Sequence, residues 1–233
     1  MAGVKNTPSK ILALASASPV FGGLSQGELE AVLAAGFMRQ YPKDSILAHA
    51  DDLWPYLFFV IDGKVDAFKE SSEGRSLMIG AIETGDIFWG LAFFHPQVGM
   101  PVRLEASEDS QVFLWERERF LPFLLNNGRL SWELSCLMVT RMLRASDIVE
   151  GLAFQPVAGR VARFLLEQSS TDMTPSPRDL TLDQMAAHIG TTREMVCRYL
   201  RSFSEEGLIN ITRTEYYITD RERLRQISSQ VKG

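Results

Sequence analysis

The hydrophobic positions of this chain change their spacing twice along its length. Between residues 24 and 36 they recur at helical spacing behind Ser25 and Glu28, which form a capping-box pattern. From residue 37 to residue 115 they form short β-prone runs separated by glycine-containing turns. This alternation predicts a small antiparallel β-barrel or jelly roll. The predicted strands are residues 46–49, 56–61, 64–69, 76–82, 87–88, 102–106 and 111–115.

Helical spacing returns at residues 129–154, where we predict one long helix that is about 39 Å in length. Its apolar stripe has intervals of 4, 4, 3, 4 and 3 residues, close to the repeat of a coiled-coil seam. Such a helix can pair with a second copy, or it can pack on its own barrel. Gly151 and residues 155–156 end the helix and form a hinge. The predicted dimer interface consists of Leu134, Met138, Met142, Ala145, Val149 and Leu152.

Two short helices are predicted on either side of Gly190, which permits a tight turn. Thr181 is the expected N-cap of the first helix, and Thr191 or Thr192 that of the second. Gly207 stops the second helix, and β-prone runs at 208–211 and 215–219 follow as a hairpin. This order predicts a winged helix-turn-helix. The predicted inward residues are Leu182, Met185, Ala186, Ile189, Val196, Leu200 and Phe203.

The second of these helices carries Arg193, Glu194 and Arg198 close to its N-terminal end. That end of a helix-turn-helix enters the major groove, where arginine pairs with guanine and glutamate accepts from cytosine. Outward charges on a helix more often form only a solvated surface, but the caps, the turn glycine and the hairpin together favour DNA binding. The expected phosphate-contacting residues are Thr181, Thr192 and Arg213.

The charge is divided unequally over the 233 residues, a length that suits two domains. The net charge of −5 consists of −6 in residues 1–156 and +1 in residues 157–233. Because phosphate neutralisation dominates non-specific affinity, the near-neutral second part is expected to depend on base contacts and dimerisation. The predicted domains are an arm at 1–23, an effector-sensing β-barrel domain at 24–128, a dimerisation helix and hinge at 129–156 and the winged helix-turn-helix at 157–233.

The cysteines and the remaining motifs exclude several classes of protein. Cys136 and Cys197 provide neither a disulfide framework nor a CxxC metal site, which suits a reducing cytoplasm. The apolar run at residues 11–15 is too short for a secretory signal, and no run approaches the length of a membrane span. Because no nucleophile–base pattern, phosphate loop or metal-ligand spacing occurs, we do not expect an enzyme.

Residues 56–94 resemble the effector domain of CRP/FNR-type bacterial transcription regulators. The matching features are the glycine between paired strands, the glycine turn and Gly85–Asp86 before the effector segment. The C-terminal segment matches the same family independently, so the resemblance covers roughly residues 20–225. It implies an α+β homodimer that binds palindromic DNA with a GTG-type half-site core and contacts RNA polymerase. The alternative is a small-molecule or haem sensor that acts through protein–protein interaction.

The resemblance also carries an expectation about the effector. Family members that bind cyclic AMP hold it with a glutamate, an arginine and a serine or threonine, but this chain has Gly90, Met100 and Pro101 there. Arg103, three residues on in a strand, points to the other face. Cyclic AMP is therefore not expected. The apolar residues of this segment are Phe88, Trp89, Leu91, Phe93, Phe94, Val98 and Met100, and those expected to line an effector pocket, with Gly90, are Phe88, Trp89, Leu91 and Met100.

Two interpretations of this apolar segment stay open. It is either a filled pocket without a ligand or a site for an apolar small molecule or for haem. Some resembling regulators sense gases through haem, and His95 is then the candidate axial ligand, with His49 behind it. The oxygen-sensing members need a cysteine cluster near the N-terminus, so the absence of one excludes their iron–sulfur cluster.

Overall fold

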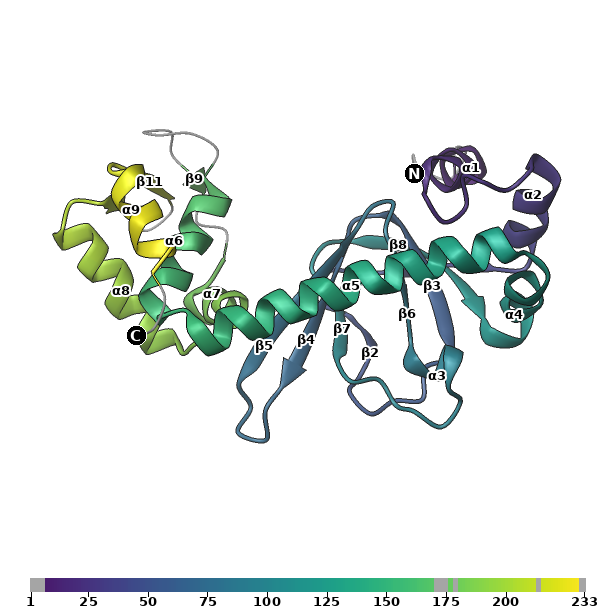
Figure 1. Cartoon of the computed structure of the whole chain (residues 1–233), viewed down its shortest axis with the longest axis horizontal. Coiled ribbons are helices and arrows are strands. Elements are labelled where there is room, and N and C mark those ends of the chain that lie inside the picture. The colour runs from purple at the N-terminus through teal and green to yellow at the C-terminus, as the bar shows by residue number, and fades with distance from the viewer. Residues whose placement is uncertain (1–6, 170–175, 178–179, 213–214, 231–233) are drawn as a thin grey trace. The chain divides into compact units, whose positions relative to one another are not determined.

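The computed structural model describes residues 7–169, 176–177, 180–212 and 215–230 (Figure 1). The chain divides into two compact units. The first, which we call the sheet unit, comprises Met1–Lys69 and Gly80–Leu143. The second, which we call the helical unit, comprises Glu70–Ile79 and Arg144–Gly233.

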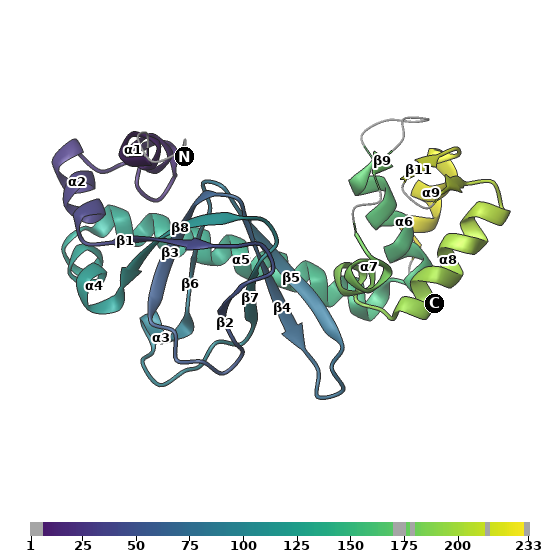
Figure 2. The same ribbon diagram turned by 180° about the vertical axis from the view of Figure 1, so that it is seen from behind.

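The sheet unit is built around two four-stranded sheets, with the strand orders β1-β8-β3-β6 and β2-β7-β4-β5. The registered pairs are antiparallel, and both views show β3 and β8 side by side (Figures 1 and 2). The predicted antiparallel sheet domain is thus confirmed, in the form of two sheets. The strands are β1 (Phe37–Tyr41), β2 (Ile46–Ala48), β3 (Tyr56–Asp62), β4 (Lys64–Glu70), β5 (Ser76–Glu83), β6 (Ile87–Trp89), β7 (Arg103–Ala106) and β8 (Ser110–Glu116).

Alternate residues of β3 enter an apolar core that helices complete. Leu57, Phe59 and Ile61 are fully buried in a cluster shared with residues of α1 (Thr7–Ala17), α2 (Gln26–Ala34), α4 (Arg117–Asn126) and α5 (Gly128–Phe154). The indole Nε1 of Trp115 donates to the carbonyl of Val32 at 2.7 Å, which joins β8 to α2 within this core. Phe58 and Val60, the intervening residues of β3, are also 0% exposed, so this strand is buried on both of its faces.

The N-terminal segment corrects one expectation. Residues 1–23 were expected to be an arm, but residues 7–17 form α1, and Ile11, Ala15 and Phe21 are buried in the core of the sheet unit. The physical reason is helical spacing: Ile11 and Ala15 lie four residues apart on one side of α1, so even a short apolar run can cover the core. By contrast, α2 begins as predicted, since Ser25 and Glu28 form the capping box.

The helical unit combines the end of α5 with a compact helix-turn-helix. It contains α6 (Val157–Gln168), α7 (Leu182–Ile189), α8 (Arg193–Glu205), α9 (Arg221–Ser228) and a sheet with the order β10-β11-β9. The predicted hairpin is β10 (Ile209–Ile211) with β11 (Glu215–Ile218), paired from Ile209 opposite Ile218. The sequence pattern did not predict α9 or β9 (Ser176–Pro177). Among the described residues, no helix is long and apolar enough to cross a membrane.

Candidate nucleic-acid interface and effector segment

The turn between α7 and α8 is fixed by local rules that the sequence displays. Thr181 and Gln184 form a capping box at the start of α7, where the Thr181 hydroxyl accepts from the Gln184 amide at 3.2 Å. Gly190 ends α7 in the left-handed conformation, with φ of 71°, which favours glycine. Thr192 then caps α8 by accepting from the amide of Met195. These caps determine where the second helix starts and therefore which residues occupy its first turn.

The inward side of both helices agrees with the prediction. Six of the seven predicted inward residues are buried, and Leu182 packs against the same cluster from a partly buried position. The left-handed Gly207 follows Glu206, the C-cap residue of α8. The six buried residues are Met185, Ala186, Ile189, Val196, Leu200 and Phe203.

The three predicted base-contacting residues are exposed on α8, and each has a local partner. Arg193 forms an ion pair with Asp183 of α7 at 3.3 Å. A hydrogen bond from Thr192 holds the pKa of Glu194 below its ordinary value, so this side chain is an anionic acceptor at neutral pH. The Arg198 guanidinium lies 5.1 Å from the centre of the Tyr199 ring. Two cations and one anion are therefore accessible within the first two turns of α8.

Of the three residues expected to contact phosphates, the structure describes Thr181 and Thr192. Thr181 is exposed and Thr192 is half-buried, and both hydroxyls already act as helix caps. Arg213 lies outside the described residues. A helix N-terminus presents unpaired amides to an anion, so the start of α7 or α8 can contact a phosphate without the capping hydroxyl.

The aromatic residues expected to line an effector pocket pack against each other and against neighbouring rings. The Phe88 ring contacts Phe58, whereas Trp89 packs against the cluster that contains Leu57 and Phe59. Leu91 begins the short helix α3 (Leu91–Phe94) after Gly90. The Phe88 and Trp89 rings also stack on each other, with their centroids 5.3 Å apart, so the two side chains link Phe58 to that cluster.

Gly90 and Met100 occupy enclosed positions. A Cβ atom at Gly90 would overlap the carbonyl oxygen of Trp54, and the Gly90 amide donates to the Tyr56 carbonyl at 2.9 Å. Met100 is 1% exposed, and its main chain exchanges hydrogen bonds with the loop at residues 51–52. Pro101 follows on the exposed side. Gly90 therefore has no room for any side chain in this conformation.

The chain's three histidines are not buried. His95 is exposed at the end of α3, His49 is exposed in the loop after β2, and His188 is half-buried on α7. No group of three or more His, Cys, Asp or Glu side chains suited to a metal ion occurs among the described residues. Because an axial haem ligand must reach an enclosed iron, His95 does not fit that role in this conformation.

The structure corrects the register of the predicted dimer interface. Leu134 is 2% exposed and Met138 packs on the core of the sheet unit, so these two residues are used inside the protomer. Leu152 is half-buried, whereas Met142, Ala145 and Val149 are exposed. The first half of α5 has two apolar faces, and the sequence pattern could not tell which of them covers the sheets. The exposed heptad stripe is Trp132, Ser135, Val139, Met142, Ser146, Val149 and Ala153.

Two arginines that the sequence pattern missed make specific contacts. Arg141 of α5 is largely buried and forms an ion pair with Asp86 at 3.3 Å, so the long helix touches the turn that precedes β6. Arg160 of α6 donates hydrogen bonds to three main-chain carbonyls. No short sequence motif predicts either contact. The partner of Arg141 is distant in sequence, and the partners of Arg160 are main-chain atoms.

Comparison with known proteins agrees with this architecture. The model of the cyclic nucleotide-binding domain matches residues 38–127, and that of the Crp-like helix-turn-helix domain matches residues 159–227. The cAMP-activated global transcriptional regulator Vfr of Pseudomonas aeruginosa is 31% identical over 191 residues, which cover 78% of this chain and 89% of that protein. The chain therefore belongs to the CRP/FNR family of DNA-binding transcription regulators, and not to a family of enzymes.

Further relatives support the same family. The cyclic AMP receptor protein of Thermus thermophilus is 26% identical over 194 residues, covering 83% of this chain and 89% of that protein. The c-di-GMP-responsive regulator CLP of Xanthomonas campestris has a TM-score of 0.73 at 22% identity, covering 84% of this chain and 99% of that one. FixK2 of Bradyrhizobium japonicum has a TM-score of 0.67 at 21% identity, with coverage of 84% and 99%. At this identity the two structures show the shared fold.

Proposed function

We propose that this regulator is a homodimer that reads palindromic DNA with a GTG-type half-site core and is controlled by an effector other than cyclic AMP. The observation that carries the DNA part is the exposed group of Arg193, Glu194 and Arg198 on a capped helix. In this proposal each arginine reads a guanine through O6 and N7, while Glu194 accepts from a cytosine amino group. RNA polymerase is the proposed second macromolecular partner.

The readout requires each side chain to leave its present partner. Arg193 exchanges an exposed ion pair with Asp183 for a guanine edge, which costs little because exposed pairs contribute at most about 1 kcal/mol. The first test is a gel shift with the region upstream of the protein's own gene at two salt concentrations. Specific binding that weakens with salt supports DNA readout. Absence of any specific complex would favour a sensor that acts through protein–protein interaction.

The homodimer is proposed to form along the exposed heptad stripe of α5. Val139 and Met142 are 51% and 63% exposed, although both are apolar. The small residues Ser135 and Ser146 alternate with them and permit close approach of a second helix. Burying a lone charge in such a seam costs about 3–5 kcal/mol, so Val139→Glu is expected to yield monomers in sedimentation experiments. Thr140→Glu, beside it on the same helix, is the matched control and should remain dimeric.

The effector is proposed to differ from cyclic AMP because the binding groups are missing. The names of Vfr and of the Thermus protein both refer to cyclic AMP. In this proposal Gly90, Met100 and Pro101 stand where the family's cyclic-AMP-binding residues are expected. The overlap at Gly90 supports the proposal, since a ribose-binding carboxylate could not be accommodated there. Isothermal titration with cyclic AMP is expected to show no saturable heat. An absorption spectrum of freshly purified protein separates the remaining choices, because a Soret band would indicate haem.

A further inference from the structure

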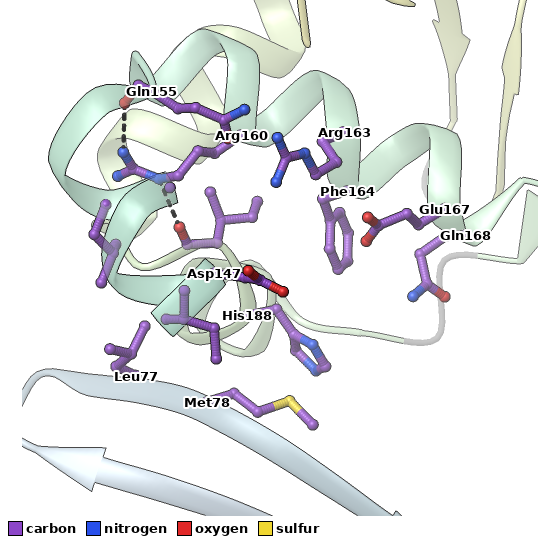
Figure 3. A pocket seen from close by; sticks show the side chains of 14 residues that line it. Leu77, Met78, Asp147, Gln155, Arg160, Arg163, Phe164, Glu167, Gln168 and His188 are labelled. Atoms are coloured by element: carbon purple, nitrogen blue, oxygen red, sulfur yellow. Dashed lines mark hydrogen bonds between the residues drawn. The ribbon is translucent and has the colours of Figure 1, made fainter. Parts of the chain in front are cut away.

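The side chain of Arg160 connects the end of α5 to the turn of the helix-turn-helix. Its Nη1 donates to the Gln155 carbonyl at 2.8 Å (Figure 3). Its Nε donates to the Ile189 carbonyl and its Nη2 donates to the Gly190 carbonyl, each at 3.0 Å. Gln155 directly follows α5, while Ile189 ends α7 and Gly190 is its cap. One guanidinium therefore binds two segments that are 34 and 35 residues apart.

The acceptors of Arg160 are groups that helices leave unpaired. The last carbonyls of a helix lack intrahelical partners and carry the negative end of the helix dipole. Within the described part of the chain, the three hydrogen bonds of the Arg160 guanidinium all go to main-chain carbonyl oxygens. Burial lowers the pKa of this guanidinium, but it stays charged at neutral pH. The two helix ends thus offset part of the cost of burying the charge.

A second contact joins the same two segments without using Arg160. A Cβ atom at Gly190 would lie 2.5 Å from Cδ2 of Leu152, so the α5 side chain packs directly on the turn. Leu152 and Arg160 also line a cavity of about 260 Å³ in the helical unit (Figure 3). The recognition helix α8 begins three residues after Gly190. The Arg160 hydrogen bonds and the Leu152 contact therefore both connect the end of α5 to the turn that leads into α8.

We propose that Arg160 is a positioning residue that fixes the recognition helix α8 relative to the end of α5 and thereby sets which half-site spacing the dimer accepts. The spacing part rests on the proposed DNA-binding function. We call the contact of Arg160 and Leu152 with the turn at Gly190 the joint. In a dimer paired through α5, any rotation of α8 about this joint changes the separation of the two recognition helices. Half-sites about 10 base pairs apart, one turn of the duplex, match two such helices only when the joint is rigid.

Arginine is required by the geometry of the three acceptors. Its planar fork presents donors in fixed directions, whereas a lysine ammonium is a compact charge at the end of a flexible stem. Arg160→Lys therefore keeps the charge and loses the simultaneous contact with Gln155, Ile189 and Gly190. Arg163 lies on the same helix and is exposed, so Arg163→Lys is the matched control.

The joint can be tested without DNA or effector by hydrogen exchange of the full-length protein. Arg160→Lys is expected to speed exchange of the amides between Gly190 and Val196 by about tenfold, and exchange in the sheet unit should not change. Leu152→Ala should loosen the same amides through the other contact. If the Gly190–Val196 amides exchange at the wild-type rate in Arg160→Lys, as they should in Arg163→Lys, Arg160 does not hold the turn and the proposal is overturned.

The spacing role is tested with palindromic duplexes whose half-sites lie at one-turn spacing or are moved two base pairs closer or farther. Wild type and Arg163→Lys are expected to prefer the one-turn duplex. Arg160→Lys should lose about tenfold of that preference and keep its discrimination between correct and altered bases in a half-site. An unchanged spacing preference would overturn the inference. If the wild type itself fails to bind any duplex specifically, the proposed function fails, and the exchange experiment still decides whether Arg160 holds the joint.

Discussion

The recognition segment, residues 181–205, and the effector segment, residues 85–101, differ in how much of their chemistry is local. The recognition segment is defined by neighbours in sequence: a cap, a turn glycine and three side chains within six positions of one helix. The effector segment is held in place by contacts with distant parts of the chain: β3, the loop at residues 51–54 and α5. Local rules fix the first, whereas packing between distant segments fixes the second. This difference explains why the output of the regulator is easier to assign than its input.

The largest expected effect concerns the enclosed glycine of the effector segment. Gly90→Ala places a methyl group against the Trp54 carbonyl and should destabilise the protein by roughly 1–3 kcal/mol in urea unfolding. Gly80→Ala is the control, because nothing lies within 4 Å of its Cβ position. Gly90→Glu is expected to be at least as unstable and to bind no cyclic AMP. A stable Gly90→Glu protein that binds cyclic AMP would contradict the contrast between the two segments.

The next effect concerns the base readout by the recognition helix. Arg198→Ala should cost roughly 1–3 kcal/mol of binding to the palindrome and relax the preference at one base pair of each half-site. Competition gel shifts with single-base variants measure both quantities. Arg225→Ala, an exposed arginine on α9, should leave the preference intact. Equal losses on specific and scrambled duplexes would show that Arg198 contacts only phosphates.

A smaller effect is expected at the N-cap of α8, and it tests whether the Thr192 side chain stabilises the start of this helix. Thr192→Ala removes the acceptor for the Met195 amide and the donor to Glu194, so we expect a loss of about 1 kcal/mol in stability. Thr192→Ser should restore most of it. Thr191→Ala is the control, since the main-chain amide of Thr191, which the substitution keeps, donates to the Ala186 carbonyl. A Thr192→Ala protein as stable as wild type would show that tertiary packing alone sets the start of α8.

The smallest effect comes from a buried acid in the sheet unit. Asp66 on β4 is 6% exposed, and burial raises its pKa although Lys64 lowers it in part. An acid with a raised pKa in the folded state binds more protons there, so stability falls as pH rises from about 4 through the folded value. Asp66→Asn should therefore raise the melting temperature at neutral pH by about 2 °C, a gain that disappears below pH of about 4. The exposed Glu73→Gln should change nothing at either pH.

Particular residues show how far the sequence could be interpreted. Ser25, Thr181, Gly190 and Gly207 act where the sequence predicted, because caps and left-handed turns depend on neighbouring residues. Leu134 was misplaced because α5 has apolar residues on two faces, and only the fold shows which face covers the sheets.

Other features left no local pattern to detect. The α1 helix was missed because its apolar run is short, although it covers a core built by distant strands. Arg160 carries no motif, since it binds main-chain carbonyls that any sequence supplies. The base-contacting, phosphate-contacting and effector roles stay predictions until binding is measured.

We propose that this regulator reads DNA as its family does and is not controlled by cyclic AMP. The most direct measurement is fluorescence anisotropy of the full-length protein with a GTG-type palindromic duplex and with a scrambled duplex, each with and without millimolar cyclic AMP. The account predicts a preference for the palindrome that cyclic AMP does not change. An increase of tenfold or more in affinity for the palindrome on addition of cyclic AMP would contradict it.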